Sequence, residues 1–171
     1  MALREVLKFP DPRLKNVSEP IVEVDDTLRE LARDMIEVMY DEPGIGLAAP
    51  QVGASVRMFV IDTEWSDDGA EKNALVVINP EIVAREGRIT WEEGCLSVPD
   101  YSATVERDAK ITLKGIDLDG KPIEEHAEGL RAVCIQHEID HLDGILFIDR
   151  ISRLKRSLYV KKRKKQLAAE D

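Results

Sequence analysis

Residues 132 to 144 are Ala132-Val-Cys-Ile-Gln-His-Glu-Ile-Asp-His-Leu-Asp-Gly144, and this stretch decides how the rest of the chain is interpreted. His137 and His141 are two of only three histidines, and residues four positions apart lie on one face of a helix. Two imidazoles in that arrangement can bind one metal ion, and Glu138 between them can reach a water on the metal. The stretch therefore predicts a helix from about Glu128 to Leu142, ended by glycine, with a hydrolytic metal site.

Two structural interpretations compete with a hydrolytic site. A His-Glu-x-x-His match can arise by chance on a surface helix. However, the surrounding residues are apolar, and polar side chains within an apolar helix need partners, which favours a metal. A closed structural site would need four protein ligands, and the chain offers only three good ones.

Two histidines make an incomplete site, because catalytic zinc sites commonly use three protein ligands and leave one position for water. No histidine follows His141, and the only glutamate after it is Glu170 at the tail. We therefore expect the third ligand upstream, which distinguishes the chain from common metalloproteases with the same helix. The candidates are Cys95, His126 and Cys134.

The three candidates differ in how well they fit. Cys134 lies about 10 Å of helix rise from His141, at ~1.5 Å per residue, and its short side chain tilts away from the metal. His126 is typical of a surface histidine beside two glutamates. Cys95 lies in Glu93-Gly-Cys-Leu-Ser97, where the glycine permits a close backbone approach, and a metal would hold it as a thiolate.

The flanking sequence predicts helices at both ends and strands between residues 55 and 125, which indicates an α+β domain. Apolar residues at helical spacing predict a first helix from about Asp25 to Tyr40. Residues 75–78 predict a buried strand that Asn79-Pro80 ends, and residues 117–120 predict a hairpin turn. A last helix should begin near Ile151.

That last helix combines an apolar stripe with a basic tail. Ile151, Leu154 and Leu158 are expected to dock on the body, and the helix should protrude beyond Tyr159. Nine of the 24 basic residues and no acidic residue lie between positions 150 and 165, so the remainder carries 15 basic against 34 acidic residues. The body should therefore repel DNA and other nucleic acids, while the tail could attract them or be only a solvated helix end.

Length and composition set broad limits. A chain of 171 residues with 43% hydrophobic and 34% charged residues is typical of one globular domain. No apolar run approaches the roughly 20 residues of a membrane span, and no signal-peptide pattern is recognised, so we expect a cytoplasmic protein without a membrane partner. In that reducing compartment, the two cysteines are expected to be free thiols or metal ligands.

Three segments of the chain together resemble the signature motifs of the peptide deformylase family. They are Gly44-Ile-Gly-Leu-Ala-Ala-Pro-Gln51, Glu93-Gly-Cys-Leu-Ser97 and Gln136-His-Glu-Ile-Asp-His141, in the family's order and spacing. The opening Phe9-Pro-Asp-Pro-Arg-Leu14 is also similar, and the resemblance covers roughly residues 3–150. It implies an α+β fold in which a central metal-binding helix packs among antiparallel or mixed β-sheets, with helices at both ends.

The resemblance also implies an activity: removal of the formyl group from the N-terminal formyl-methionine of nascent polypeptides, which releases formate. The implied metal is Fe²⁺, with Zn²⁺, Ni²⁺ or Co²⁺ as possible occupants. It implies a catalytic region over residues 1–150, followed by a basic helix over 151–171 of the same domain. In related bacterial members such a helix docks on the ribosome, so a ribosome contact is expected here.

By the same resemblance, roles are assigned to residues of each motif. The metal ligands would be Cys95, His137 and His141, with Glu138 as acid/base and with Gln51 and the backbone N–H of Leu96 holding the oxyanion. Ile45 and Gly46 would lie along the peptide, and the methionine pocket would be formed by Ile45, Trp91, Leu130, Val133, Cys134 and His137. Some members carry a substrate-contacting arginine where this chain has Tyr101-Ser102.

The expected mechanism follows from metal chemistry. The metal lowers the pKa of its bound water, so that hydroxide attacks the formyl carbon while Glu138 takes a proton and passes it to the leaving amine. Two other classes remain as alternatives: a general metalloendopeptidase, and a non-catalytic RNA-binding module that the metal stabilises. Assays on formylated and unformylated peptides separate a deformylase from a general metalloendopeptidase. The RNA-binding module predicts that chelation unfolds the protein and that no hydrolysis is seen.

Overall fold

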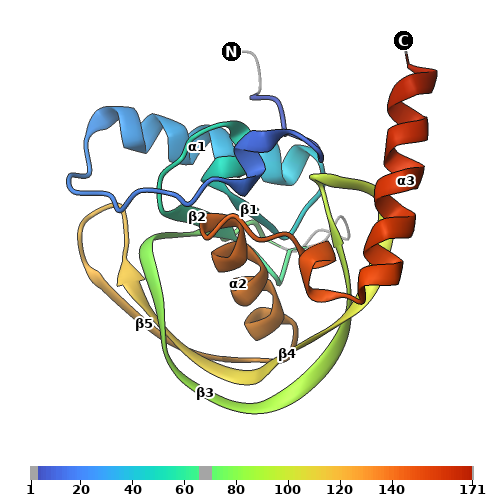
Figure 1. Ribbon diagram of the computed structural model, residues 1–171. Helices are drawn as coiled ribbons and strands as arrows, with labels where there is room; N and C mark the ends of the chain where they lie inside the picture. Colours follow the sequence, from blue (N-terminus) through green and yellow to red (C-terminus); the bar gives the residue numbers. More distant parts are fainter. Residues whose placement is uncertain (1–3, 66–70, 171) are drawn as a thin grey trace.

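Helix α2 lies at the centre of the computed structural model, which describes residues 4–65 and 71–170 (Figure 1). The predicted α+β class is confirmed, with helices near both ends and strands between them. The elements are α1 (Asp26–Asp41), β1 (Gly46–Ala48), β2 (Met58–Ile61), β3 (Leu75–Cys95), β4 (Val98–Ile116), β5 (Pro122–Glu128), α2 (Gly129–Leu142) and α3 (Arg153–Ala169), together with three short 3-10 turns, Pro12–Lys15, Ala49–Val52 and Phe147–Arg150.

Within the described residues, five strands form one antiparallel sheet in the order β1-β2-β3-β4-β5. Strands β3, β4 and β5 are long and curve around α2, while α1 lies on the other side of β1 and β2 (Figure 1). The predicted turn between β4 and β5 is confirmed, since Asp117 accepts backbone hydrogen bonds across it and Gly120 has a φ of 77°. The central helix is therefore enclosed on several sides by the sheet.

Strand β2 is buried on both faces of the sheet. Met58 and Val60 pack into the cluster that contains α1, whereas Phe59 and Ile61 pack into the cluster that contains α2. Successive side chains of a strand point to opposite faces, so a strand between two helices must be apolar throughout. Burial of each such side chain contributes roughly 1.5–3 kcal/mol to the stability of the fold, and so holds the strand in place between the two helices.

Strand β3 is longer than the sequence indicates. The prediction that Asn79-Pro80 ends the strand is wrong, because β3 continues through this dipeptide to Cys95. The register shifts between Ile78 and Glu81, and Asn79 adopts a φ of 50°. The Asn79 amide accepts from the N–H and donates to the carbonyl of Ile21, both at 2.8 Å. These bonds satisfy the backbone polar groups of Ile21 while β3 continues through the irregularity.

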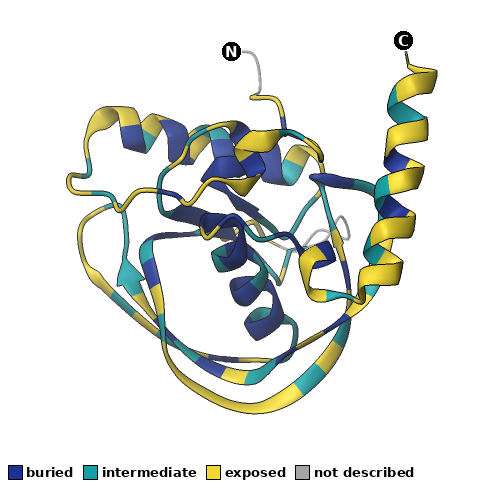
Figure 2. Cartoon of the chain, in the orientation of Figure 1, coloured by how far each residue is buried: buried dark blue, intermediate teal, exposed yellow. Residues whose placement is uncertain are grey.

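Helices α1 and α2 follow the sequence closely. The Asp25 side chain accepts from the backbone N–H of Leu28 at 2.9 Å and caps α1. Helix α2 begins at Gly129, whose φ of 61° lets the chain turn sharply out of β5. Most of α2 is buried (Figure 2). Polar side chains on this helix must therefore find partners inside the protein.

Helix α3 departs from the expected docking. Leu154 and Leu158 are 70% and 59% exposed, so the prediction that they dock is wrong, although Ile151 does pack on the body. Tyr159 and Arg163 are buried instead, and most of the helix is exposed (Figure 2). The buried residues of the docking face are an aromatic ring and a cation, Tyr159 and Arg163. A search for apolar residues at helical spacing does not find such a face. Within the described residues, no helix has the length and apolarity needed to cross a bilayer.

Candidate metal centre

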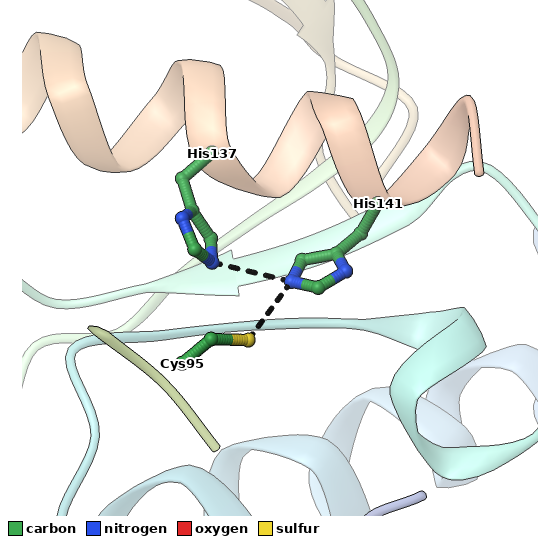
Figure 3. Close-up of side chains that lie close together, drawn as sticks. All are labelled: Cys95, His137 and His141. Atoms are coloured by element: carbon green, nitrogen blue, oxygen red, sulfur yellow. Dashed lines mark hydrogen bonds between the residues drawn. The ribbon is translucent and has the colours of Figure 1, made fainter. Parts of the chain in front are cut away.

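Three side chains from two elements meet at one point (Figure 3). His137 and His141 extend from α2 toward Cys95, which is the last residue of β3. His141 Nε2 lies 3.2 Å from His137 Nε2 and 3.4 Å from Cys95 Sγ. The potential ligand atoms of this trio lie within 4.8 Å of one another. One thiol and two imidazoles at these separations could hold a single transition-metal ion.

The other candidates for the third ligand are not part of this group. His126 is exposed and shares a 2.9 Å hydrogen bond with Thr112 Oγ1 on the far side of the sheet pair β4–β5. Cys134 is buried, and its Sγ lies 3.9 Å from the carbonyl oxygen of Ile45. The expectation that neither completes the site therefore agrees with the geometry.

Local backbone structure brings Cys95 to the histidines. The register between β3 and β4 shifts at Gly94, and Cys95 then pairs with Val98. Phe9 donates its backbone N–H to the Ser97 carbonyl at 2.7 Å, which ties the turn after Cys95 to the N-terminal segment. The cysteine therefore lies on a tight, anchored turn that faces α2.

A buried carboxylate orients His137. Its Nδ1 lies 2.8 Å from Glu93 Oε1, and an ionised carboxylate can only accept, so Nδ1 carries the proton and Nε2 is free to bind a metal. Burial raises the pKa of Glu93, but the paired Arg107 outweighs this effect and lowers that pKa to about 2. The Nδ1 atom of His141, by contrast, is buried and has no hydrogen-bond partner in the described part of the chain.

Glu93 belongs to a charged chain that sequence reasoning missed. Arg107 donates two hydrogen bonds to Glu93, at 2.7 and 2.8 Å, and a third to Asp140 at 2.6 Å. Asp140 also accepts from Arg150 at 2.6 and 2.7 Å. Arg107 follows the alternation of inward-facing residues on β4, so a charge at an inward position was the available signal. Removing one partner of such a buried set typically costs about 3–5 kcal/mol.

The pKa values of the two histidines are shifted in opposite directions. Burial lowers the pKa of His137, but Cys95 and Glu93 outweigh burial and hold that pKa well above its usual value. Burial and the neighbouring charge of His137 push the pKa of His141 well below its usual value. A cation bound between them would favour the neutral, ligating form of both rings.

Glu138 lies beside the trio with an unsatisfied oxygen. The residue is 2% exposed and lines a cavity, and its Oε2 has no hydrogen-bond partner among the residues that the structure describes. Burial raises its pKa to about 7. A carboxyl group that lacks a partner inside the protein and titrates near neutrality is suited to exchange protons with a bound water.

Gln51 reaches the site from the 3-10 turn after β1. Its Oε1 accepts from the Ala48 N–H at 2.9 Å, and its Nε2 donates to Ser97 Oγ at 3.0 Å and lies 3.7 Å from Cys95 Sγ. The amide is therefore held at both ends, and its NH₂ group points toward the cysteine. Ser97, which is fully buried, was not recognised from sequence.

A cavity of about 440 Å³ opens beside these groups. Glu93 and Glu92 also line it, and every residue expected to bind substrate or stabilise charge is present. Those expected residues are Ile45, Gly46, Gln51, Trp91, Leu96, Leu130, Val133, Cys134, His137 and Glu138. His141 lies behind this lining and is 1% exposed.

Gly46 fits closely against α2. A Cβ atom at this position would lie 2.9 Å from Cys134 Sγ and 3.1 Å from Glu138 Cδ. Strand β1 is one of two edge strands, paired only with β2 in the described part of the sheet. Its second edge is therefore available to an extended chain lying in the cavity.

An α+β fold with a Cys/His/His group, a buried glutamate and an apolar cavity defines a metal-dependent hydrolase of small amide or peptide substrates. The family model described as polypeptide deformylase matches residues 3–157, and the chain belongs to this family. It is thus a metal-dependent amide hydrolase that removes the formyl group from the N-terminal formyl-methionine of nascent polypeptides.

Individual relatives cover nearly the whole chain. A peptide deformylase of Phenylobacterium zucineum is 52% identical over 170 residues, which is 99% of both chains. One from Alkalilimnicola ehrlichii is 54% identical over 156 residues, covering 91% of this chain and 86% of the relative. The crystal structure of a peptide deformylase from Legionella pneumophila has a TM-score of 0.89 and 46% identity, covering 99% of both chains. The predicted family, fold and enzyme class are confirmed.

Proposed function

We propose that Cys95, His137 and His141 hold the catalytic metal, with one position left for water. The donor set fits, because a thiolate and two imidazoles suit Fe²⁺ and Zn²⁺ rather than Mg²⁺ or Ca²⁺. The unpartnered Oε2 of Glu138 beside them also supports a water at this point. We propose Fe²⁺ as the native metal, with Zn²⁺, Ni²⁺ or Co²⁺ able to occupy the site.

The metal, when bound, acidifies water and so supplies a nucleophile near neutral pH. Glu138 takes the proton that the attacking water loses as its oxygen bonds to the formyl carbon. When the C–N bond breaks, Glu138 passes that proton to the departing amine, and formate is released. The pKa of about 7 that burial gives Glu138 supports both halves of this exchange.

Charge that develops on the formyl oxygen needs hydrogen-bond donors. We assign this role to the Gln51 Nε2 and the backbone N–H of Leu96. The anchoring of Gln51 by Ser97 and Ala48 supports the assignment, because a donor held in place requires no reorganisation during the reaction.

The substrate peptide is proposed to pair with the free edge of β1, along Ile45 and Gly46. Its methionine side chain would occupy the apolar part of the cavity, formed by Ile45, Trp91, Leu130, Val133 and Cys134. A peptide deformylase of Acinetobacter baumannii, with a TM-score of 0.82 and 37% identity over 88% of this chain and 99% of its own, was solved with Met-Ala-Ser bound. That complex supports a peptide site in this fold.

The decisive experiment measures formate release from formyl-Met-Ala, performed anaerobically with protein loaded with Fe²⁺. Glu138→Gln should retain the metal but lose about 10²–10⁴-fold in kcat, the usual contribution of a proton shuttle. Glu86→Gln, at an exposed position on β3, is the matched control and should behave as wild type. Retained turnover in Glu138→Gln would reject the role of Glu138.

We further propose that residues 1–150 form the catalytic region and 151–171 a helix of the same domain, in a cytoplasmic protein that meets its substrates where chains are synthesised. Exposed basic residues on α3 support a ribosome contact, since they can attract RNA phosphates. Combined Lys161→Glu, Lys164→Glu and Lys165→Glu should abolish salt-sensitive co-sedimentation with ribosomes while leaving formyl-Met-Ala hydrolysis unchanged. Co-sedimentation that neither the substitutions nor salt alter would reject the contact.

A further inference from the structure

Helix α3 is mostly exposed, yet two of its residues are buried close to the ligand-bearing segments. Tyr159 is 1% exposed and Arg163 is 7% exposed. Tyr159 belongs to a small apolar cluster that contains Phe9, Phe147 and Val98, and against which Cys95 itself packs. The inner face of α3 and one proposed metal ligand therefore share a core that is separate from the two larger clusters.

A series of aromatic contacts connects Tyr159 to the other side of the metal centre. The ring centroids of Tyr159 and Tyr101 lie 4.8 Å apart. Tyr101 stacks on Phe147 with a centroid distance of 6.1 Å and an interplanar angle of 16°. Phe147 in turn stacks on His137 at 6.2 Å and 28°. The His137 ring is thus supported by Phe147, while Glu93 holds its Nδ1.

Polar contacts connect α3 to the turn that follows Cys95. Arg163 Nε donates to the Phe9 carbonyl at 2.7 Å, and the Phe9 N–H donates to the Ser97 carbonyl at 2.7 Å. Lys162 Nζ donates to the Asp100 carbonyl at 3.2 Å. These contacts hold the backbone of residues 97–100, whose position sets that of the Cys95 thiol.

We propose that α3 is a clamp for the metal centre, in which Tyr159 and Arg163 are positioning residues for His137 and Cys95. This inference rests on the ligand set proposed above. Without Tyr159, Tyr101 and Phe147 lose a packed neighbour, and the His137 ring loses the rigidity of its support. Without Arg163, the Phe9 carbonyl loses its buried donor and the Ser97 turn loosens. Residues that orient metal ligands typically alter metal affinity by about 10–100-fold when replaced.

The test uses the full chain loaded with Co²⁺, whose visible absorption reports thiolate ligation, and measures the rate of metal loss to excess chelator. Tyr159→Leu and Arg163→Gln should release Co²⁺ about 10–100-fold faster than wild type, with altered absorption. Tyr159→Phe should stay close to wild-type behaviour, because it keeps the ring and loses only a 3.4 Å hydrogen bond from the Tyr159 hydroxyl to the Pro99 carbonyl. Leu158→Ala, at an exposed position on the same helix, is the matched control. All rates are compared at a fixed interval below each variant's thermal midpoint, so that a general loss of stability is not counted.

Two results separate failure of the clamp from failure of the ligand assignment. If Tyr159→Leu and Arg163→Gln release Co²⁺ at the wild-type rate with unchanged absorption, while Cys95→Ala loses the thiolate band, the clamp is rejected and the ligands stand. If Cys95→Ala keeps that band, the ligand assignment fails and the clamp fails with it. Should either variant not fold, the other decides, because each acts through a different contact.

Discussion

Cys95 and Cys134 line the same cavity from different elements, and their surroundings differ in exposure and in neighbouring polar groups. Cys95 ends β3, is partly exposed, and lies near His141 Nε2 and Gln51 Nε2. Cys134 lies on α2 under the backbone of β1, and burial raises the pKa of its thiol well above the usual value. Residue type therefore does not identify the ligand. Access to both imidazoles and to hydrogen-bond donors favours Cys95 as the ligand.

The largest expected effect comes from replacing each cysteine in turn with alanine, which removes the thiol. Cys95→Ala should weaken metal binding by more than about 100-fold, since loss of a direct ligand exceeds the 10–100-fold effect of supporting residues, and deformylation should fall to background. Cys134→Ala should retain one metal per chain. Elemental analysis of the two purified proteins measures this directly. Metal retained by Cys95→Ala and lost by Cys134→Ala would reverse the assignment.

Gln51 tests the surroundings of Cys95 without removing a ligand. Gln51→Glu keeps the acceptor for the Ala48 N–H but removes the NH₂ donor, so kcat should fall by about 10²–10³-fold with metal content unchanged. Steady-state kinetics on formyl-Met-Ala at several substrate concentrations provide the measurement. An increase in KM with unaltered kcat would indicate ground-state binding instead of oxyanion stabilisation.

Gly46 tests the surroundings of Cys134. A methyl group at this position would meet Cys134 Sγ at 2.9 Å and Glu138 Cδ at 3.1 Å, so Gly46→Ala must displace one of them. We expect kcat to fall by about 10–100-fold, because displacements near 1 Å can cost that much. The double variant Gly46→Ala/Cys134→Ala removes the closer obstacle and should recover part of the loss. No recovery would mean that Glu138 alone sets the spacing.

The smallest expected effect is on stability. Cys134→Ala leaves a small void in a packed wall and should lower the free energy of unfolding by about 1 kcal/mol, with a modest rise in KM for formyl-Met substrates. Thermal unfolding of the metal-loaded protein checks the first value. A loss of several kcal/mol would show that Cys134 is a structural residue of α2 rather than a pocket lining.

The sequence predicts the parts of this molecule whose signal is local. Helix α1 and helix α2 have regular apolar spacing and end signals. The cavity residues were expected from the resemblance to one family, although Trp91, Leu130, Val133 and Cys134 lie outside its three motifs. The continuity of β3 was not predictable, because Asn79-Pro80 is a normal strand terminator and only the long-range bonds of Asn79 to Ile21 accommodate it.

The burial of charged side chains was also not predictable from the sequence. Arg107 on β4 is paired with Glu93 and Asp140 across long sequence distances, and no spacing rule relates these three positions. The docking face of α3 was not predicted for the same reason. Arg163 donates a hydrogen bond to the carbonyl of Phe9, a partner 154 positions away. Local apolar patterns can predict which helices form, whereas the choice of docking face depended here on tertiary partners.

The short edge strand β1 has a consequence for self-association. Exposed sheet edges are templates for pairing with other chains, and proteins restrict them to limit aggregation. Strand β1 offers only three residues, Gly46–Ala48, and its neighbours Gly44 and Ile45 line the cavity. A flexible peptide end can reach such a recessed edge, whereas the rigid border of a second folded sheet cannot lie along it. The geometry proposed to receive a substrate strand thus also discourages fibre-like growth through β1.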